Sequence, residues 1–322
     1  ERRFGWDVHG LPIEMEVQKN LNLEDPQQID EYGIGKFNEA CRTQVQTNTE
    51  NWEKITRKIG RWVDFENDYK TMDIDFMESV WWVFKELWEK DLIYQDYKVL
   101  PYSWAASTPL SNFEANMDYR DVEDPSIYFT LNAREDFNSV KKGDKFLVWT
   151  TTPWCIPGNL AIAIGKDIDY SRVSMNNEFY WIATQRLQEL DEFEVEIISS
   201  CNGSELIGSS YIPAYNEYEN LYSDGAFRLI HSDDTNTDSG SGLVSQAPAY
   251  GESDFYALKN SGIDVIADPV TLSGKFDNTF KELEGLNVKD ADSVIMTQLN
   301  ERGNLFSQKT EMHSYPFCWR TG

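Results

Sequence analysis

The chain has 322 residues, which is enough for two domains or for one domain with a large insertion. Hydrophobic residues make up 40% and aromatic residues 14%, so the chain can build packed cores and is not of the disordered class. The formal net charge of −26 repels a phosphate backbone at long range, so composition alone argues against a nucleic-acid partner.

The cysteines and histidines offer little for metal or covalent chemistry. The four cysteines have no paired spacing, which is typical of a reducing compartment and not of zinc ribbons or disulfide frameworks. The three histidines leave little material for Ser-His catalysis. No apolar run of about 18 residues occurs, and residues 1–10 lack the apolar stretch of a secretory signal. We therefore expect a cytoplasmic protein with no metal, no cofactor and no membrane partner.

Residues 24–98 show helical periodicity. In the stretch 37–60, apolar residues recur near one stripe, and Gly60 is a plausible end of the helix. A second helix is predicted over 73–92, with Asp73 or Asp75 as its N-terminal cap. Helices of this kind usually pack into a stem or bundle.

From about residue 125 to 310 the pattern changes to short apolar runs separated by turn residues. Strands are predicted over 126–132, 145–152, 160–165, 179–184, 195–200, 227–232 and 242–248, and helices over 252–262 and 288–303. This pattern predicts a compact, barrel-like β unit within an α/β chain. We expect a helical segment over 1–124, a β-rich domain over 125–310 and a return strand over 311–322.

The stretch "WTTTPWCIPGN", residues 149–159, combines a strand with a rigid loop. Three consecutive threonines favour an extended strand, because β-branched side chains are stiff and fit a pleated surface. Pro153 and Pro157 end that strand and fix an irregular path. Because a row of hydroxyls makes a poor core, we interpret the stretch as the lining of a polar pocket.

Several long motifs follow one another in the order found in one family. They are "FGWDVHGLPIE" (4–14), "GRWVDFENDYKTMDIDFMESVWWVFKELWEKDLIY" (60–94), "TPLSNFE" (108–114), "WTTTPW" (149–154), "SGSGLVSQAPAYGESDF" (239–255), "VKDAD" (288–292) and "HSYPFCWR" (313–320). With these motifs the chain closely resembles isoleucyl-tRNA synthetases, in wording most like the eukaryotic cytoplasmic form.

The resemblance also implies which part of such an enzyme this is. The family activates its amino acid with ATP through a "HIGH" tetrapeptide and a "KMSKS" loop, and neither occurs here. We therefore expect a fragment that spans connective polypeptide 1, the insertion in the catalytic domain that carries the editing site. In the family that site hydrolyses valine wrongly attached to tRNA(Ile). The implied partners are the misacylated 3′ end of tRNA(Ile) and the remainder of the synthetase, with its catalytic and anticodon-binding domains.

The resemblance assigns the residues of the editing site one by one. Asp254 matches the aspartate that holds the α-ammonium group, and Thr151 and Thr152 match threonines that contact substrate and water. The alternatives are a helix N-cap for Asp254 and ordinary strand positions for the threonines. The remaining residues expected to line the pocket are Thr150, Trp154, Cys155, Asn159, Ser245, Gln246 and Tyr250. For Trp154 the alternative is a core role, and for Asn159 a plain turn.

At three positions the family's residue roles cannot be carried over directly to this chain. Relatives generally carry Thr at the position of Cys155, and a thiol is a weaker hydrogen-bonding group than a hydroxyl. They carry His at the position of Ser245, where the ring helps to exclude isoleucine. The site is then relaxed, refilled by Gln246 or Tyr250, or decayed to a module that only binds the tRNA end. Asp7 resembles an aspartate near the amino-acid pocket of the synthetic site, and its alternative is a surface carboxylate.

Overall fold

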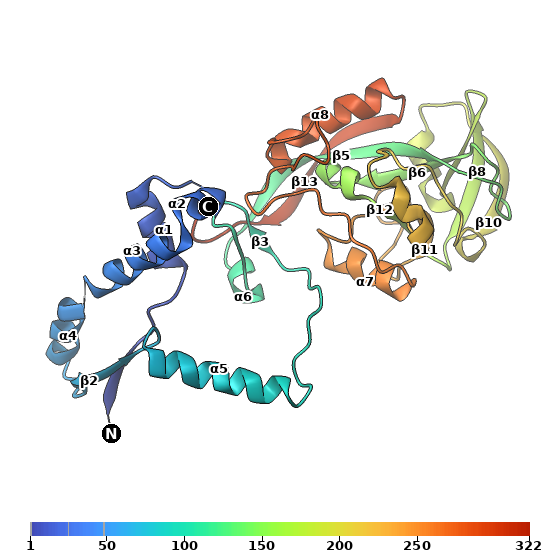
Figure 1. Cartoon of the computed structure of the whole chain (residues 1–322). Helices are drawn as coiled ribbons and strands as arrows, with labels where there is room; N and C mark the ends of the chain where they lie inside the picture. The colour runs from blue at the N-terminus through green and yellow to red at the C-terminus, as the bar shows by residue number, and fades with distance from the viewer. Residues whose placement is uncertain (1, 25, 48) are drawn as a thin grey trace. The chain divides into compact units, whose positions relative to one another are not determined.

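The computed structural model describes residues 2–24, 26–47 and 49–322, and the chain divides into two compact units. Unit 1 comprises Glu1–Tyr97 and Trp104–Thr108, and unit 2 comprises Lys98–Ser103 and Pro109–Gly322. Figure 1 shows the order of their elements. None of the described helices is long and apolar enough to cross a membrane.

Unit 1 is mainly helical. Its elements are β1 (Arg3–Trp6), α1 (Leu11–Leu21), α2 (Pro26–Tyr32), α3 (Ile34–Gln46), α4 (Thr49–Lys58), β2 (Asp64–Lys70) and α5 (Ile74–Trp88). Strands β1 and β2 pair in parallel. The single helix predicted over 37–60 is wrong, because the chain forms α3 and α4 with a break between them. Helix α3 ends at Gln46, and the following Thr47 lies in a turn and has a β-branched side chain of low helix propensity.

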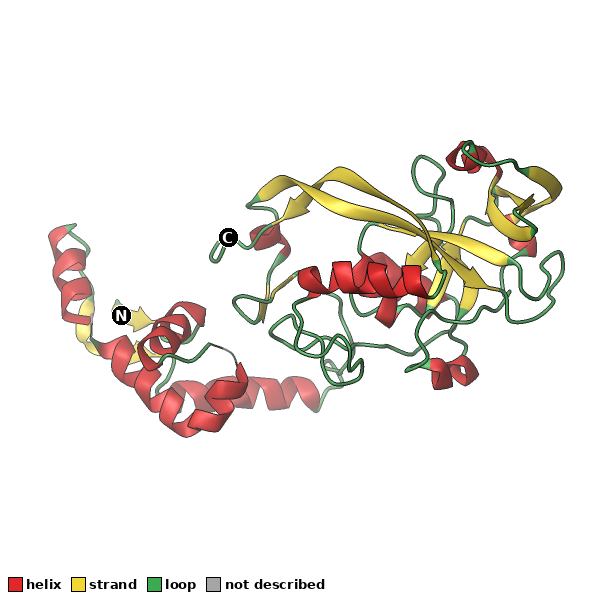
Figure 2. Ribbon diagram, turned by 90° about the horizontal axis from the view of Figure 1, so that it is seen from above, coloured by secondary structure: helices red, strands yellow, loops and turns green. Residues whose placement is uncertain are grey.

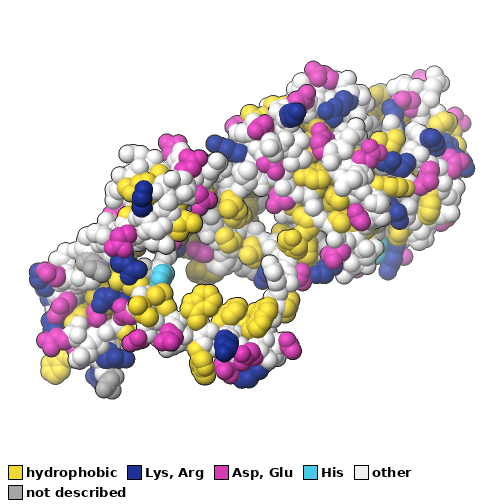
Figure 3. All heavy atoms as spheres, in the orientation of Figure 1, with side chains coloured by type: hydrophobic (Ala, Val, Ile, Leu, Met, Phe, Trp, Pro, Cys, Tyr) yellow, Lys and Arg dark blue, Asp and Glu magenta, His cyan; other side chains and the backbone are white. Residues whose placement is uncertain are grey.

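The apolar stripe expected along these helices is only partly buried. Phe37 is 5% exposed, whereas Trp52 is 56% and Ile59 is 74% exposed. The second predicted helix is confirmed as α5, with Asp73 at its N-cap position. No residue of α5 is buried, and Figure 3 shows apolar side chains gathered along it. The expected packing of α5 into a bundle is therefore not observed among the described residues of this unit.

Unit 2 is built on a mixed sheet of nine described strands. Its strands are β5 (Tyr119–Asn132), β6 (Lys145–Thr150), β7 (Ala161–Ile164), β8 (Asp169–Met175), β9 (Glu178–Ala183), β10 (Glu196–Asn202), β11 (Arg228–His231), β12 (Val244–Gln246) and β13 (Leu305–Pro316). Its longer helices are α7 (Glu252–Asn260) and α8 (Val288–Glu301). Every strand and both helices predicted over 126–303 are confirmed, and β8 is an addition.

Short elements precede or connect these strands. They are β3 (Tyr102–Ser103), β4 (Thr108–Pro109), α6 (Asn112–Ala115) and the 3₁₀ turns η1 (Pro153–Gly158), η2 (Thr184–Leu190), η3 (Gly203–Glu205) and η4 (Glu219–Asp224). The return strand expected over 311–322 belongs to β13, which begins earlier and pairs antiparallel with β5 along most of its length. Helix α8 lies alongside this long pair (Figures 1 and 2).

The sheet forks along β6. One edge of β6 pairs with β5 over Lys145–Thr150. The other edge pairs first with β9, at Lys145 and Phe146, and then with β12, at Trp149. Two branches, β9-β8-β10 and β12-β7-β11, therefore diverge from one strand. This divergence gives the sheet its curled, barrel-like form, as predicted, and the threonine stretch lies at the end of β6 beside β12.

Candidate functional site

The threonine loop, residues 149–159, leaves the sheet at the fork. Thr150 is buried and ends β6, whereas Thr151 and Thr152 are partly exposed. The backbone N–H of Thr152 donates to Thr150 Oγ1 at 3.1 Å, and the two hydroxyls lie 3.3 Å apart. The loop then forms η1, with Pro153 at its start and Pro157 inside it. The predicted rigid turn after a hydroxyl-bearing strand is confirmed.

A carboxylate from a distant helix holds this loop. Trp154 N donates to Asp292 Oδ1 at 2.8 Å, and Asp292 is 6% exposed. Its position in "VKDAD" carried no local signal for this contact, because 138 residues separate the two partners.

An aromatic pair covers the loop. The rings of Trp154 and Tyr250 lie 4.8 Å apart at an interplanar angle of 58°. Tyr250 donates its hydroxyl to Asp268 Oδ1 at 3.1 Å. A Cβ on Gly158 would lie 3.1 Å from the Tyr250 ring, so the absence of a side chain there allows the ring to close over η1. Tyr250 therefore packs on the loop through Trp154 and is held by Asp268.

Asn159 holds Ser245 in place. Its Nδ2 group donates to Ser245 Oγ at 2.9 Å and to Ala161 O at 2.8 Å, while its Oδ1 accepts from the buried Tyr211 hydroxyl at 2.6 Å. Both amide hydrogens are thus committed, and the plain turn considered for Asn159 is wrong. Because Ser245 Oγ accepts from Asn159, its own hydrogen is left to donate elsewhere. Gln246 is buried and donates its side-chain amide back to Ser245 O at 3.1 Å.

Asp254 closes the site from α7. It lies in the first turn of that helix, and Gly251, not Asp254, occupies the N-cap position. Its Oδ2 accepts from Ala247 N at 2.8 Å, which ties it to the end of β12. A Cβ on Gly251 would lie 2.8 Å from Asp254 Cγ, so glycine leaves room for the carboxylate to fold back. Burial raises the pKa of Asp254 above its ordinary value, and the hydrogen bond from Ala247 only partly opposes this.

Cys155 is partly buried, with Thr152, Asp254 and Asp292 close enough to affect its thiol. Shielding from water raises the pKa of its thiol well above the ordinary value, although a hydrogen bond with Thr152 opposes the shift. The negative charges of Asp254 and Asp292 raise the pKa further. The thiol is therefore protonated at neutral pH, and a protonated thiol is a poor nucleophile.

Asp7 belongs to unit 1 and not to this group. It is exposed and directly follows β1, as the surface-carboxylate alternative predicted. Among the described residues, no group of three His, Cys, Asp or Glu side chains could hold a metal ion. The expectation that neither metal nor cofactor is needed stays a prediction.

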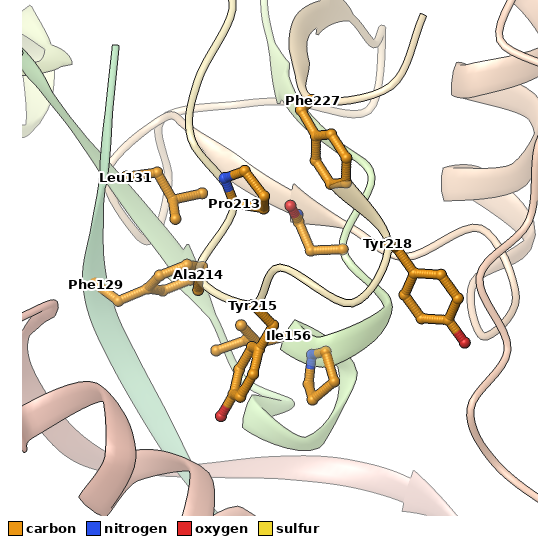
Figure 4. Close-up of a pocket in the computed structure, with 10 residues that line it drawn as sticks. Phe129, Leu131, Ile156, Pro213, Ala214, Tyr215, Tyr218 and Phe227 are labelled. Atoms are coloured by element: carbon orange, nitrogen blue, oxygen red, sulfur yellow. The ribbon is translucent and has the colours of Figure 1, made fainter. Parts of the chain in front are cut away.

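One narrow hollow lies on the core side of the loop. Figure 4 shows apolar side chains from β5, η1 and the segment 213–218 turned toward it. Of the predicted site residues only Asn159 lines it, and the hollow is too narrow to hold a water molecule. Ser245, which Asn159 holds, does not line this hollow.

Comparison with known proteins identifies the family. A family model described as tRNA synthetases class I (I, L, M and V) matches residues 1–265. The chain belongs to this synthetase family. The chain is 45% identical to the isoleucine–tRNA ligase of Bdellovibrio bacteriovorus and 42% identical to that of Tetrahymena thermophila, over 99% and 100% of its length. It spans about 30% of the length of either relative.

Solved structures of editing regions are similar to this synthetase chain only distantly. The structure titled GlLeuRS-CP1 matches 60% of the chain and 99% of its own length, with a TM-score of 0.43 and 13% identity. The editing domain of the P. knowlesi cytosolic leucyl-tRNA synthetase matches 60% of the chain and 97% of its own length, with a TM-score of 0.41 and 8% identity.

Proposed function

We propose that this chain is the part of an isoleucyl-tRNA synthetase that carries the editing site and hydrolyses Val-tRNA(Ile). The observation that carries the proposal is the meeting of the threonine loop, Ser245 and Asp254 where β6 and β12 end. The specificity for isoleucine is proposed from the names of the relatives. The eukaryotic type read from the sequence stays a prediction, because bacterial and ciliate relatives match at nearly equal identity.

A second site is needed because a hydrophobic pocket discriminates poorly against a smaller ligand. One missing methylene changes binding by only ~1–3 kcal/mol, and valine against isoleucine is the standard example of this limit. A smaller hydrolytic pocket that admits valine and excludes isoleucine removes the error after it has been made.

The reaction is attack of water on the ester carbonyl. The water oxygen forms a bond to the carbonyl carbon, the ester C–O bond breaks, and the products are free valine and tRNA with a terminal hydroxyl. Asp254 accepts hydrogen bonds from the α-ammonium group and so orients the ester. The hydroxyls of Thr151 and Thr152 are donors for the water and for the developing oxyanion. Because the thiol of Cys155 is protonated, we assign it no role as a covalent nucleophile.

Ser245 is the position at which the exclusion of isoleucine from the pocket can be tested. Its hydroxyl is fixed by Asn159, whereas Tyr250 packs on Trp154 and the Gln246 side chain donates to the Ser245 carbonyl oxygen. A serine leaves more room than the histidine of relatives, so exclusion of isoleucine depends on how tightly Asn159 and the loop close around it. The second candidate is a tRNA-end-binding module without hydrolysis, which the weak hydrogen-bonding capacity of Cys155 favours.

The test is deacylation of Val-tRNA(Ile) and Ile-tRNA(Ile) by the purified chain. We expect release of valine well above the rate without protein, and a clear preference for valine over isoleucine. Binding of both substrates with no release above background would support the decayed module instead. Release of both amino acids at equal rates would contradict the proposal that the pocket excludes isoleucine.

A further inference from the structure

Asp292 is a buried carboxylate that the proposed chemistry does not use. It lies on α8 and is 6% exposed. Among the described residues, Trp154 N is the one hydrogen-bond donor to it, on Oδ1. Lys289, one turn earlier on α8, directs its Nζ to Asp124 at 2.9 Å and not to Asp292. A charge held in this way is unfavourable for stability alone, which points to a role in the loop it holds.

The loop needs an external partner at this point. Thr152 occupies the N-cap position of η1, but its side chain makes no capping hydrogen bond. Pro153 follows and has no N–H group. Trp154 N is therefore the first donor of the turn, and such donors at helix starts have no partner within the helix. Asp292 supplies the cap from a helix distant in sequence.

We propose that Asp292 is a positioning residue of the site, acting through Trp154 to fix the loop that carries Thr151, Thr152 and Cys155. Capping fixes the backbone at Trp154, and the adjoining Cys155 N donates to Thr152 O at 3.0 Å, so the constraint passes along the chain. The consequence for hydrolysis rests on the proposed function, whereas the anchoring of the loop does not.

The pKa values of Asp292 and Cys155 also reflect the position of Asp292 next to the loop. Burial raises its pKa to about 6, against the hydrogen bond from Trp154 and the positive charge of Lys289. Its negative charge in turn raises the pKa of the Cys155 thiol. Cys155 therefore reports on whether the loop stays closed against Asp292.

The experiment measures alkylation of Cys155 by iodoacetamide, mapped by mass spectrometry, in Asp292→Ala, Asp292→Ser and Asp292→Asn. Alanine and serine lack an acceptor that reaches Trp154 N, and we expect alkylation of Cys155 to rise at least tenfold in both. Asparagine keeps an acceptor oxygen but, like alanine and serine, removes the charge that raises the pKa of the thiol. Asp292→Asn is therefore the reference variant, and its alkylation rate is expected to stay well below the rates of Asp292→Ala and Asp292→Ser. The serine variant serves where the alanine variant does not fold.

Two controls separate anchoring from general loosening. Asp290→Ala removes an exposed carboxylate from the same helix and is expected to leave Cys155 unchanged. Cys201, partly buried in the same unit, is expected to keep its rate in every variant. Equal alkylation of Cys155 in Asp292→Ala, Asp292→Ser and Asp290→Ala would overturn the proposal. So would a parallel rise at Cys201, because the loss of protection would then be global.

Deacylation is measured on the same proteins. We expect Asp292→Ala and Asp292→Ser to lose at least tenfold in the rate with Val-tRNA(Ile), and Asp292→Asn to be rescued. If the unchanged chain does not hydrolyse Val-tRNA(Ile), the proposed function fails while the alkylation result still decides the anchoring. If it hydrolyses and the truncated variants keep its rate, the positioning role fails and the proposed function stands.

Discussion

Asp292→Asn is expected to stabilise the protein, increasingly so as the pH rises. The pKa of Asp292 is raised by burial from 3.8 to about 6. The folded state therefore binds the proton more tightly than the unfolded state, and the free energy of unfolding falls as the pH rises between these two values. Above about pH 6 the full penalty is present. At 1.36 kcal/mol per pH unit, a rise of about 2 units corresponds to about 3 kcal/mol.

Asparagine removes that penalty and keeps the acceptor for Trp154 N. We expect the variant to exceed the unchanged chain by about 0.5 kcal/mol at pH 4 and by up to about 3 kcal/mol at pH 7. The other titratable groups near Asp292 are Lys289 on α8, Asp124 on β5, Cys155 on η1 and Tyr315 on β13. They are the same in both proteins, so their own titration largely cancels in the difference.

The assay is urea unfolding in dilute solution across this pH range, followed by circular dichroism, with Asp290→Asn as the matched control. The control carries the same chemical change on the exposed side of α8 and is expected to show no comparable dependence on pH. A stability difference for Asp292→Asn that is constant with pH, or a variant less stable than the unchanged chain at pH 7, would refute the reasoning.

Three further outcomes are expected. Asp254→Asn keeps an acceptor for Ala247 N but loses the charge for the ammonium, so we expect at least a tenfold loss of Val-tRNA(Ile) deacylation. Stability should not fall, because burial already raises the pKa of this carboxyl, and unchanged deacylation would remove Asp254 from the site. Ser245→His restores a ring at the pocket wall, so hydrolysis of Ile-tRNA(Ile) should fall relative to Val-tRNA(Ile); an unchanged ratio would show that other residues already form the sieve. With a net charge of −26, the chain should bind tRNA weakly at physiological salt; submicromolar affinity in a filter-binding assay would contradict this.

Local pattern predicted the fold of unit 2 well. The strands are short, strongly apolar and bounded by turn residues, so the apolar pattern and the strand boundaries gave the same prediction at each of them. Strand β8 was missed because "DYSRVSM" mixes polar and apolar residues and carries no β-branched run. In unit 1 the prediction of a single helix over 37–60 failed because α3 ends before Thr47, whose low helix propensity outweighed a continuous apolar stripe.

The sequence proposed the members of the site but could not give their contacts. The motif resemblance named Asn159, Ser245 and Asp254, yet only the structure shows that Asn159 spends both amide hydrogens within the protein. Asp292 and Tyr211 were missed altogether. Each contacts the loop through one hydrogen bond across a long sequence separation, and no local pattern reports such a bond.

The location of the substrate is tested most directly by a crystal structure of the chain with a non-hydrolysable analogue of the 3′-valyl adenosine ester. We expect the ammonium group of the analogue within hydrogen-bond distance of Asp254, and its carbonyl oxygen beside the hydroxyls of Thr151 and Thr152. An analogue bound elsewhere on the chain, or one whose ammonium group turns away from Asp254, would contradict the editing site proposed here.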